Sequence, residues 1–212
     1  MGDRPGIQFD SVIHCGLQFR CVIAYNGTNS AVLIAPRSNH PLGVGALCVD
    51  NSLHFERIYV LGGGGGKAIG LNIDASVGSV QRNRITITEI EGTPTPTTSA
   101  MSRGVCIRGG AHAWANDIGV AALLHPLLAG FDVEGGIGNR FSGHVAPYGP
   151  DGVAVKVASS HNVFDLDIGG SIFPFNVGIH VLKGARDNKF LLRRNEAKRP
   201  FVNDADGSNR LL

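Results

Sequence analysis

Charged side chains are scarce in this sequence: they make up 17% of its 212 residues, against about 25% in an ordinary soluble domain. The 19 basic and 17 acidic residues are scattered along the chain and give a formal net charge of only +2. Binding to a phosphate backbone requires a concentrated basic face. We therefore expect no nucleic-acid partner.

Long apolar runs are absent as well. No stretch approaches the roughly 20 apolar residues of a membrane-spanning helix, and Met1 to Gly6 lack the charged and then apolar run of a signal peptide. We therefore expect neither membrane insertion nor a secretion signal. On the same ground the Asn26-Gly27-Thr28 sequon is interpreted as a turn rather than a glycosylation site.

Cysteine is rare, with four residues, and none of them forms a CxxC pair or a His/Cys spacing typical of zinc. We interpret Cys15, Cys21, Cys48 and Cys106 as buried thiols, although their redox state stays open. The sequence contains no metal-ligand spacing, no nucleotide fingerprint and no Ser-His-Asp order. It therefore predicts no metal site and no cofactor.

Two low-complexity segments interrupt the chain. The run Gly62–Gly66 precedes Lys67, but a phosphate-binding loop requires a glycine where Leu61 stands and Ser or Thr where Ala68 stands. We interpret this run as a flexible turn. The segment Thr93–Ser99, rich in proline and threonine, is expected to project as a solvated loop.

Glycine is abundant, with 30 residues, and it marks an internal repeat. A complete copy begins with a glycine and an alternating apolar strand, passes through a short turn, and ends with asparagine and a second alternating strand. Copies begin at residues 104, 130, 152, 178 and, truncated, 200, so the period is about 24 residues. Copies at Gly70 and, more loosely, at Ala46 fit the same unit.

Neither strand of a copy can bury its apolar face alone, so the copies are expected to stack with equivalent residues in line. For the first strand the predicted interior columns are Val105, Phe131, Val153, Ile179 and Phe201, and beside them Ile107, Val133, Val155 and Val181, with Asn203 in the last copy. For the second strand the predicted column is Ile118, Phe141, Phe164, Phe190 and Leu211.

An asparagine precedes the second strand of every copy: Asn116, Asn139, Asn162, Asn188 and Asn209. Asparagine tolerates left-handed backbone and hydrogen-bonds to its neighbours, so this column predicts an asparagine ladder at a repeated tight turn. With this ladder the sequence resembles the pectin-lyase-like right-handed parallel β-helices, over roughly residues 45–212, and among them the tail-spike and tail-fibre proteins of bacteriophages.

The resemblance implies an all-β, single-stranded solenoid of about seven coils of roughly 22–26 residues. Residues 1–44 would form irregular early coils or an attachment segment. A β-sandwich, which favours hairpin turns every 8–12 residues, and a leucine-rich repeat, whose L-x-x-L-x-L pattern is missing, are the alternatives.

Stacking would also align outward residues. Arg108, Glu134 and Lys156 would form a ladder of alternating charge that stabilises the register. On the second strand, His144, Asp167 and Arg193 would occupy equivalent positions in three coils, with Ser142 and Asp165 two residues earlier on the same face. A solvated salt-bridge ladder accounts for this cluster, and so does a sugar-binding site.

A catalytic role for the same cluster would involve Asp165, Asp167 and His144. Two carboxylates at i and i+2 approach the spacing used in glycoside hydrolysis, but the neighbouring arginine would keep Asp167 ionised, which suits a base rather than an acid.

The fold resemblance implies three functions. The first is a virion structural protein of the tail-spike or tail-fibre type, a homotrimer that contacts other virion proteins and attaches to a host surface polysaccharide. The second is a polysaccharide lyase or glycoside hydrolase, and the third is a passive capsid or baseplate spike. Fold analogy alone does not choose among them.

Overall fold

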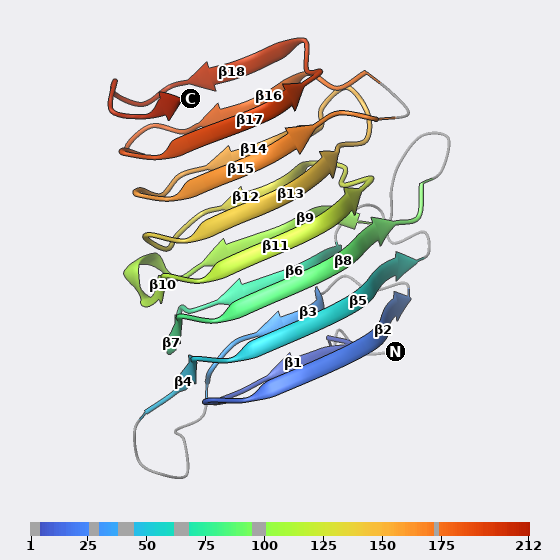
Figure 1. The fold of residues 1–212 in the computed structure, drawn as a ribbon, viewed down its shortest axis with the longest axis vertical. Helices are drawn as coiled ribbons and strands as arrows, with labels where there is room; N and C mark the ends of the chain where they lie inside the picture. The colour runs from blue at the N-terminus through green and yellow to red at the C-terminus, as the bar shows by residue number, and fades with distance from the viewer. Residues whose placement is uncertain (1–4, 26–29, 38–44, 62–67, 95–100, 172–173) are drawn as a thin grey trace.

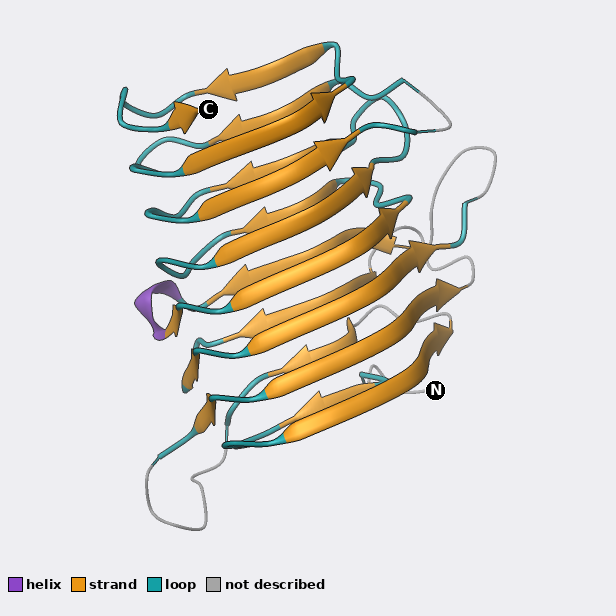
Figure 2. Cartoon of the chain, viewed as in Figure 1, coloured by secondary structure: helices purple, strands orange, loops and turns teal. Residues whose placement is uncertain are grey.

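The computed structural model describes residues 5–25, 30–37, 45–61, 68–94, 101–171 and 174–212, and the regular secondary structure of these residues is almost entirely β-strand (Figures 1 and 2). The Asn26-Gly27-Thr28 sequon, the run Gly62–Lys67 and all but the first two residues of the segment Thr93–Ser99 lie outside the described residues. A single short 3-10 helix, η1 at Gly110–His112, interrupts the strands of the described residues.

Two large parallel sheets, each of eight strands, contain most of the chain, and consecutive strands alternate between them. Figure 1 shows them one behind the other, each stacked along the long axis from the N-terminus to the C-terminus. Sheet A consists of β1 (Ile7–Phe9), β3 (Ser30–Ile34), β6 (Ala68–Asp74), β9 (Met101–Arg108), β12 (Ala129–Val133), β14 (Val153–Val157), β16 (Val177–Val181) and β18 (Arg199–Asn203).

Sheet C provides the second strand of each coil, where a coil is one strand of sheet A with the next strand of sheet C. It consists of β2 (Gly16–Tyr25), β5 (Ser52–Leu61), β8 (Arg84–Gly92), β11 (Asp117–Leu124), β13 (Arg140–Ala146), β15 (Val163–Ile168), β17 (Lys189–Asn195) and β19 (Arg210–Leu211). A narrow third sheet, sheet B, holds β4 (Leu47–Val49), β7 (Ser79–Gln81) and β10 (Ala113–Trp114). This all-β arrangement of parallel sheets is compatible with the predicted β-helix.

The core lies between sheets A and C, and aromatic rings line it in register. Phe141 pairs with Phe164 and Phe164 with Phe190 along sheet C, and all three rings are fully buried. Ring centroids are 4.8 Å apart in the first pair and 5.0 Å in the second, with nearly parallel planes. The predicted register of the second-strand column is therefore confirmed from Ile118 to Leu211, and its members are interior except Leu211, which is 50% exposed.

The predicted asparagine ladder is present and is longer than expected. Each asparagine accepts, at its side-chain oxygen, both the backbone N–H and the side-chain amide of the preceding asparagine; Asn116, for example, donates to Asn139 at 3.0 Å through each group. The series also includes Asn51 and Asn83. The left-handed backbone, however, belongs to the residue before the asparagine, as at Arg82, Ala115 and His161.

The first strand is displaced in one copy. Val155, not Val153, pairs with both Phe131 and Ile179, and Val157, not Val155, pairs with Val133 and Val181. The prediction was wrong here because it aligned Gly152 with the glycines of the other copies. Ala154 occupies that position: its carbonyl oxygen would lie 2.6 Å from a Cβ added to Gly130.

The copy at Ala46 was also assigned to the wrong strand. Residues Leu47–Val49 form β4 of sheet B, and the sheet A strand of that coil is β3. Residues 7–9, 16–25 and 30–34 already pair within the two large sheets. The coils therefore continue into the segment before residue 45.

The outward charge ladder of sheet A is only partly as predicted. Arg108 Nε lies 3.0 Å from Glu134 Oε2, but Lys156 stands in register with Asp132 and His180 rather than with Glu134. The same two-residue displacement of the β14 copy explains the error.

The four cysteines are free thiols, and only two of them are buried as predicted. Cys48 and Cys106 are buried, whereas Cys15 is half-buried and Cys21 is exposed. Burial raises the pKa of the Cys106 thiol to about 11, so this thiol is protonated and unreactive at neutral pH. Cys21 is exposed because it lies on the outer face of β2.

Candidate functional site

The outer face of sheet C carries a column of side chains that runs along the axis of the stack, and from His54 onward each of them stands three residues after a ladder asparagine. Strand pairing places these residues in register: Gln18, His54, Thr86, Gly119, Ser142, Asp165 and Leu191. Polar side chains thus follow one another from coil to coil at about 4.8 Å. The column has a gap where Gly119 contributes no side chain.

The gap is widened by a register irregularity in β11. Between the inward residues Val120 and Leu123, β11 places two alanines, Ala121 and Ala122, where the facing strand β13 has only His144. This is the two-against-one pattern of a β-bulge. Gly119, Ala121 and Ala122 have little or no side chain, so β11 is a low part of the outer face.

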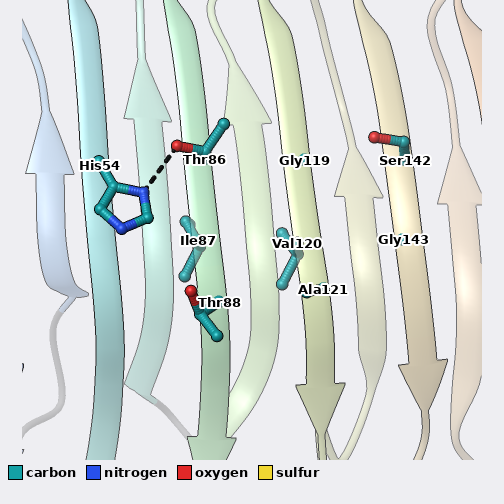
Figure 3. Close-up of a pocket in the computed structure, with 9 residues that line it drawn as sticks. All are labelled: His54, Thr86, Ile87, Thr88, Gly119, Val120, Ala121, Ser142 and Gly143. Carbon is teal, nitrogen blue, oxygen red and sulfur yellow. Dashed lines mark hydrogen bonds between the residues drawn. The ribbon is translucent and has the colours of Figure 1, made fainter.

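A hollow of about 330 Å³ opens above this low part (Figure 3). His54, Thr86 and Thr88 stand on one side and Ser142 on the other, with Gly119 and Ala121 between them. His54 Nδ1 lies 2.9 Å from Thr86 Oγ1, which fixes the orientation of the ring. The sides of the hollow therefore offer hydroxyl and imidazole groups over an apolar floor.

Gly143 is required for the shape of this floor. Its φ of +133° and the position of a Cβ, which would lie 1.7 Å from the Val120 carbonyl oxygen, exclude any other residue. Gly119 is under no such restriction, since a Cβ there would meet only the Ser142 hydroxyl at 3.3 Å.

A second hollow, of about 200 Å³, adjoins the first. It is lined by Ala121, Gly143, His144, Asp165, Asp167 and Arg193. Because Ala121 and Gly143 line both hollows, we treat the two as one feature, the axial trough. The trough contains all five residues proposed from the sequence: Ser142 in the first hollow and His144, Asp165, Asp167 and Arg193 in the second.

Asp167 is the most strongly paired acid of the trough. Arg194 donates to both of its carboxylate oxygens, at 2.7 and 3.1 Å, and His144 Nδ1 lies 3.3 Å from Oδ2. The hydrogen bond from Arg194 is the main cause that lowers the pKa of Asp167, and its charge and that of His144 act in the same direction. Asp167 is therefore an ionised carboxylate that orients His144.

The partner of Asp167 is thus Arg194. The sequence spacing had indicated Arg193 instead, and that prediction was wrong. A register shift after Leu166 puts Asp167 opposite Arg194, because β17 has one residue more than β15 at this point. Arg193, with 77% of its side chain exposed, lies 3.6 Å from Asp165 instead.

The two arginines can be separated by titration. Replacing Arg194 by alanine is expected to raise the pKa of Asp167 toward the ordinary value of about 3.9, whereas Arg193→Ala leaves it nearly unchanged. NMR titration of the Asp167 carboxyl carbon measures both. An equal response to the two substitutions would contradict the assigned register.

The lowered pKa of Asp167 also predicts how the stability of the fold depends on pH. Since the folded-state pKa of Asp167 is lowered, the pair stabilises the fold fully above the unfolded pKa. The contribution is lost as the pH falls through the lowered folded value. Arg194→Ala should therefore weaken the dependence of the free energy of unfolding on pH over this acid range.

Another group of titratable side chains lies outside the trough, at the end of β8. Burial raises the pKa of Glu91, and the neighbouring Glu89 raises it further. His125 Nδ1 lies 3.6 Å from Glu91 Oε1. None of these three residues lines either hollow.

The sequence reasoning missed His54, Thr86, Thr88 and the small residues between them. A usable signal was present, because His54 and Thr86 stand three residues after Asn51 and Asn83, as Ser142 and Asp165 do after Asn139 and Asn162. Extending the asparagine column by two coils would have found both. The bulge at Ala121 and Ala122 has no comparable signature.

Comparisons with known proteins give no relative. No family model, no curated protein and no solved structure matches the chain. Among the described residues, no group of three or more His, Cys, Asp or Glu side chains is placed to hold a metal ion. No helix in the described part of the chain is long and apolar enough to span a membrane.

Proposed function

We propose that the chain is a right-handed parallel β-helix that binds a surface glycan along the outer face of sheet C, as the shaft of a bacteriophage tail spike or tail fibre. The parallel pairing of both large sheets and the continuous asparagine ladder support the helix. The virion role, a homotrimeric state and contacts with other virion proteins rest on the resemblance in fold.

The axial trough is the observation that carries glycan binding. Ligand sites are concave, with an apolar floor and a few placed polar groups; the first hollow, at about 330 Å³, falls within their usual range of about 300–1,000 Å³. Sugar hydroxyls both donate and accept hydrogen bonds, and the trough offers hydroxyl, imidazole, carboxylate and guanidinium groups. Except for Thr88 and Arg193, these groups stand at paired positions of the strands, so they are held in place before a ligand arrives.

Binding to lipopolysaccharide and capsular polysaccharide immobilised on a sensor tests this proposal. The double variant Ser142→Ala/Asp165→Ala is expected to bind at least about tenfold more weakly than the unaltered chain. Gln18→Ala is the matched control, since Gln18 belongs to the same column but lines neither hollow. Equal binding by all three proteins would contradict a site in the trough.

Catalysis is the second candidate, and the ionised Asp167 beside His144 favours it, since a carboxylate that orients an imidazole is suited to proton abstraction. The same samples decide the point. Release of reducing ends, abolished by Asp167→Asn, would identify a polysaccharide lyase or glycoside hydrolase. Absence of any polysaccharide binding would instead favour a passive capsid or baseplate spike.

A further inference from the structure

We infer that the axial trough takes an uncharged oligosaccharide of at least two sugar units, lying across the strands and parallel to the stacking axis. This inference rests on the proposed glycan binding. It adds the charge class, the minimum length and the direction of the ligand, and each comes from a different feature of the trough.

The direction and length follow from the arrangement of the two hollows. His54 on β5 and Asp165 on β15 lie in one column and are separated by four inter-strand steps, about 19 Å at ~4.8 Å per step. The hollows meet over Ala121 and Gly143. A single pyranose ring is shorter than this span, so one unit cannot contact both ends.

The charge class follows from the pairing of acids and bases in the second hollow. Both carboxylate oxygens of Asp167 already have partners, namely Nε and Nη2 of Arg194 and Nδ1 of His144. Asp165 and Arg193 are 3.6 Å apart, beyond the ~2.7–3.2 Å of a good hydrogen bond. The Asp165 carboxylate can therefore still accept a hydrogen bond from a ligand, and the Arg193 guanidinium can still donate one.

An uncharged sugar fits that pair best, because each hydroxyl both donates and accepts. A uronate carboxylate that pairs with Arg193 would also lie close to Asp165, and an ammonium that pairs with Asp165 would also lie close to Arg193, because these two side chains are 3.6 Å apart. Like charges at such range oppose binding. The first hollow contributes no carboxylate, lysine or arginine, and His54 is the one titratable side chain in its lining.

An array of tetrasaccharides tests the inference, with neutral hexose oligomers, galacturonate oligomers and glucosamine oligomers as separate sets, followed by calorimetric titration of the full chain. Neutral tetramers are expected to bind at least about tenfold more tightly than their monosaccharides and than either charged set. Asp165→Asn should selectively improve binding of the galacturonate set, and Arg193→Gln that of the glucosamine set.

Ala121→Leu tests the continuity of the trough. Ala121 is exposed, so a larger side chain there fills the junction without disturbing the core, and it should weaken tetrasaccharide binding at least about tenfold while leaving monosaccharide binding nearly unchanged. Gln18→Ala serves again as the control.

The outcomes separate the two levels of the proposal. If no saccharide binds, the proposed glycan binding fails and the inference fails with it. If saccharides bind but the charged sets win, or monosaccharides bind as tightly as tetramers, or Ala121→Leu affects both equally, glycan binding stands and the inference is overturned.

Discussion

Replacement of Phe164 by alanine is expected to lower the free energy of unfolding by about 4 kcal/mol, within the ~3–5 kcal/mol typical of buried Phe→Ala changes. The ring is fully buried and stacks between Phe141 and Phe190, with centroid separations of 4.8 and 5.0 Å. The strands on either side are fixed by parallel pairing, so the cavity cannot collapse. Urea denaturation followed by circular dichroism measures the loss.

Leu191→Ala on the adjacent strand β17 provides the comparison for Phe164→Ala. Leu191 faces outward and is 40% exposed, so its removal should change stability by no more than about 0.5 kcal/mol. A loss below about 1 kcal/mol for Phe164→Ala would mean that the phenylalanine column is not an interior one.

Replacement of Asn139 by alanine is expected to cost a similar amount, about 4 kcal/mol, through polar groups rather than through a cavity. Its side-chain oxygen accepts the backbone N–H and the side-chain amide of Asn116, each at 3.0 Å. Both donors are buried and would be left without a partner, at about 1–3 kcal/mol each. The measurement is again urea denaturation.

A matched control for Asn139→Ala is Asn176→Ala, because Asn176 is an exposed asparagine outside the ladder. It should leave the unfolding midpoint almost unchanged. Asn139→Asp is a second variant of similar shape that keeps an acceptor for Asn116. If Asn139→Ala is as stable as the exposed control, water replaces the ladder at little cost, and the ladder does not hold the coils together.

Much of sheet C could be predicted from the sequence because the asparagine is a fixed reference within each copy. Counting from Asn139, Asn162 and Asn188 puts Phe141, Phe164 and Phe190 two residues later, and the observed pairing agrees. A polar group with a position-specific hydrogen bond allows little freedom in alignment. The register of the second strand is therefore readable from residue spacing.

Sheet A lacked such a reference, and the prediction failed there. Glycine was used to align the copies, but the position at which the other copies have a glycine in close contact with neighbouring strands holds alanine at Ala154, while Gly152 lies before the strand. The turn between the two strands also varies in length, since Phe131 precedes its asparagine by eight residues and Val155 by seven. Spacing alone cannot resolve such differences.

The sequence predicted which residues form the candidate site better than it predicted how they pair. Ser142, His144, Asp165 and Asp167 were found because they are polar residues at regular offsets, and the structure places them in adjacent hollows. The pairing of Asp167 with Arg194 and the low floor at Ala121 both depend on bulges. Bulges arise from the fit between two strands, so they are not visible in one copy.

The hydrogen bonds of the asparagine ladder all point the same way, from each asparagine to the next one along the chain. Every interior step of the ladder therefore has the same asparagine-to-asparagine hydrogen bonds as the next step. Nothing in these bonds sets the total number of coils. A duplicated copy inserted between two existing ones would meet the same donor below and the same acceptor above. Such a scaffold can be extended or shortened by whole turns, each about 4.8 Å tall, while its cross-section stays the same.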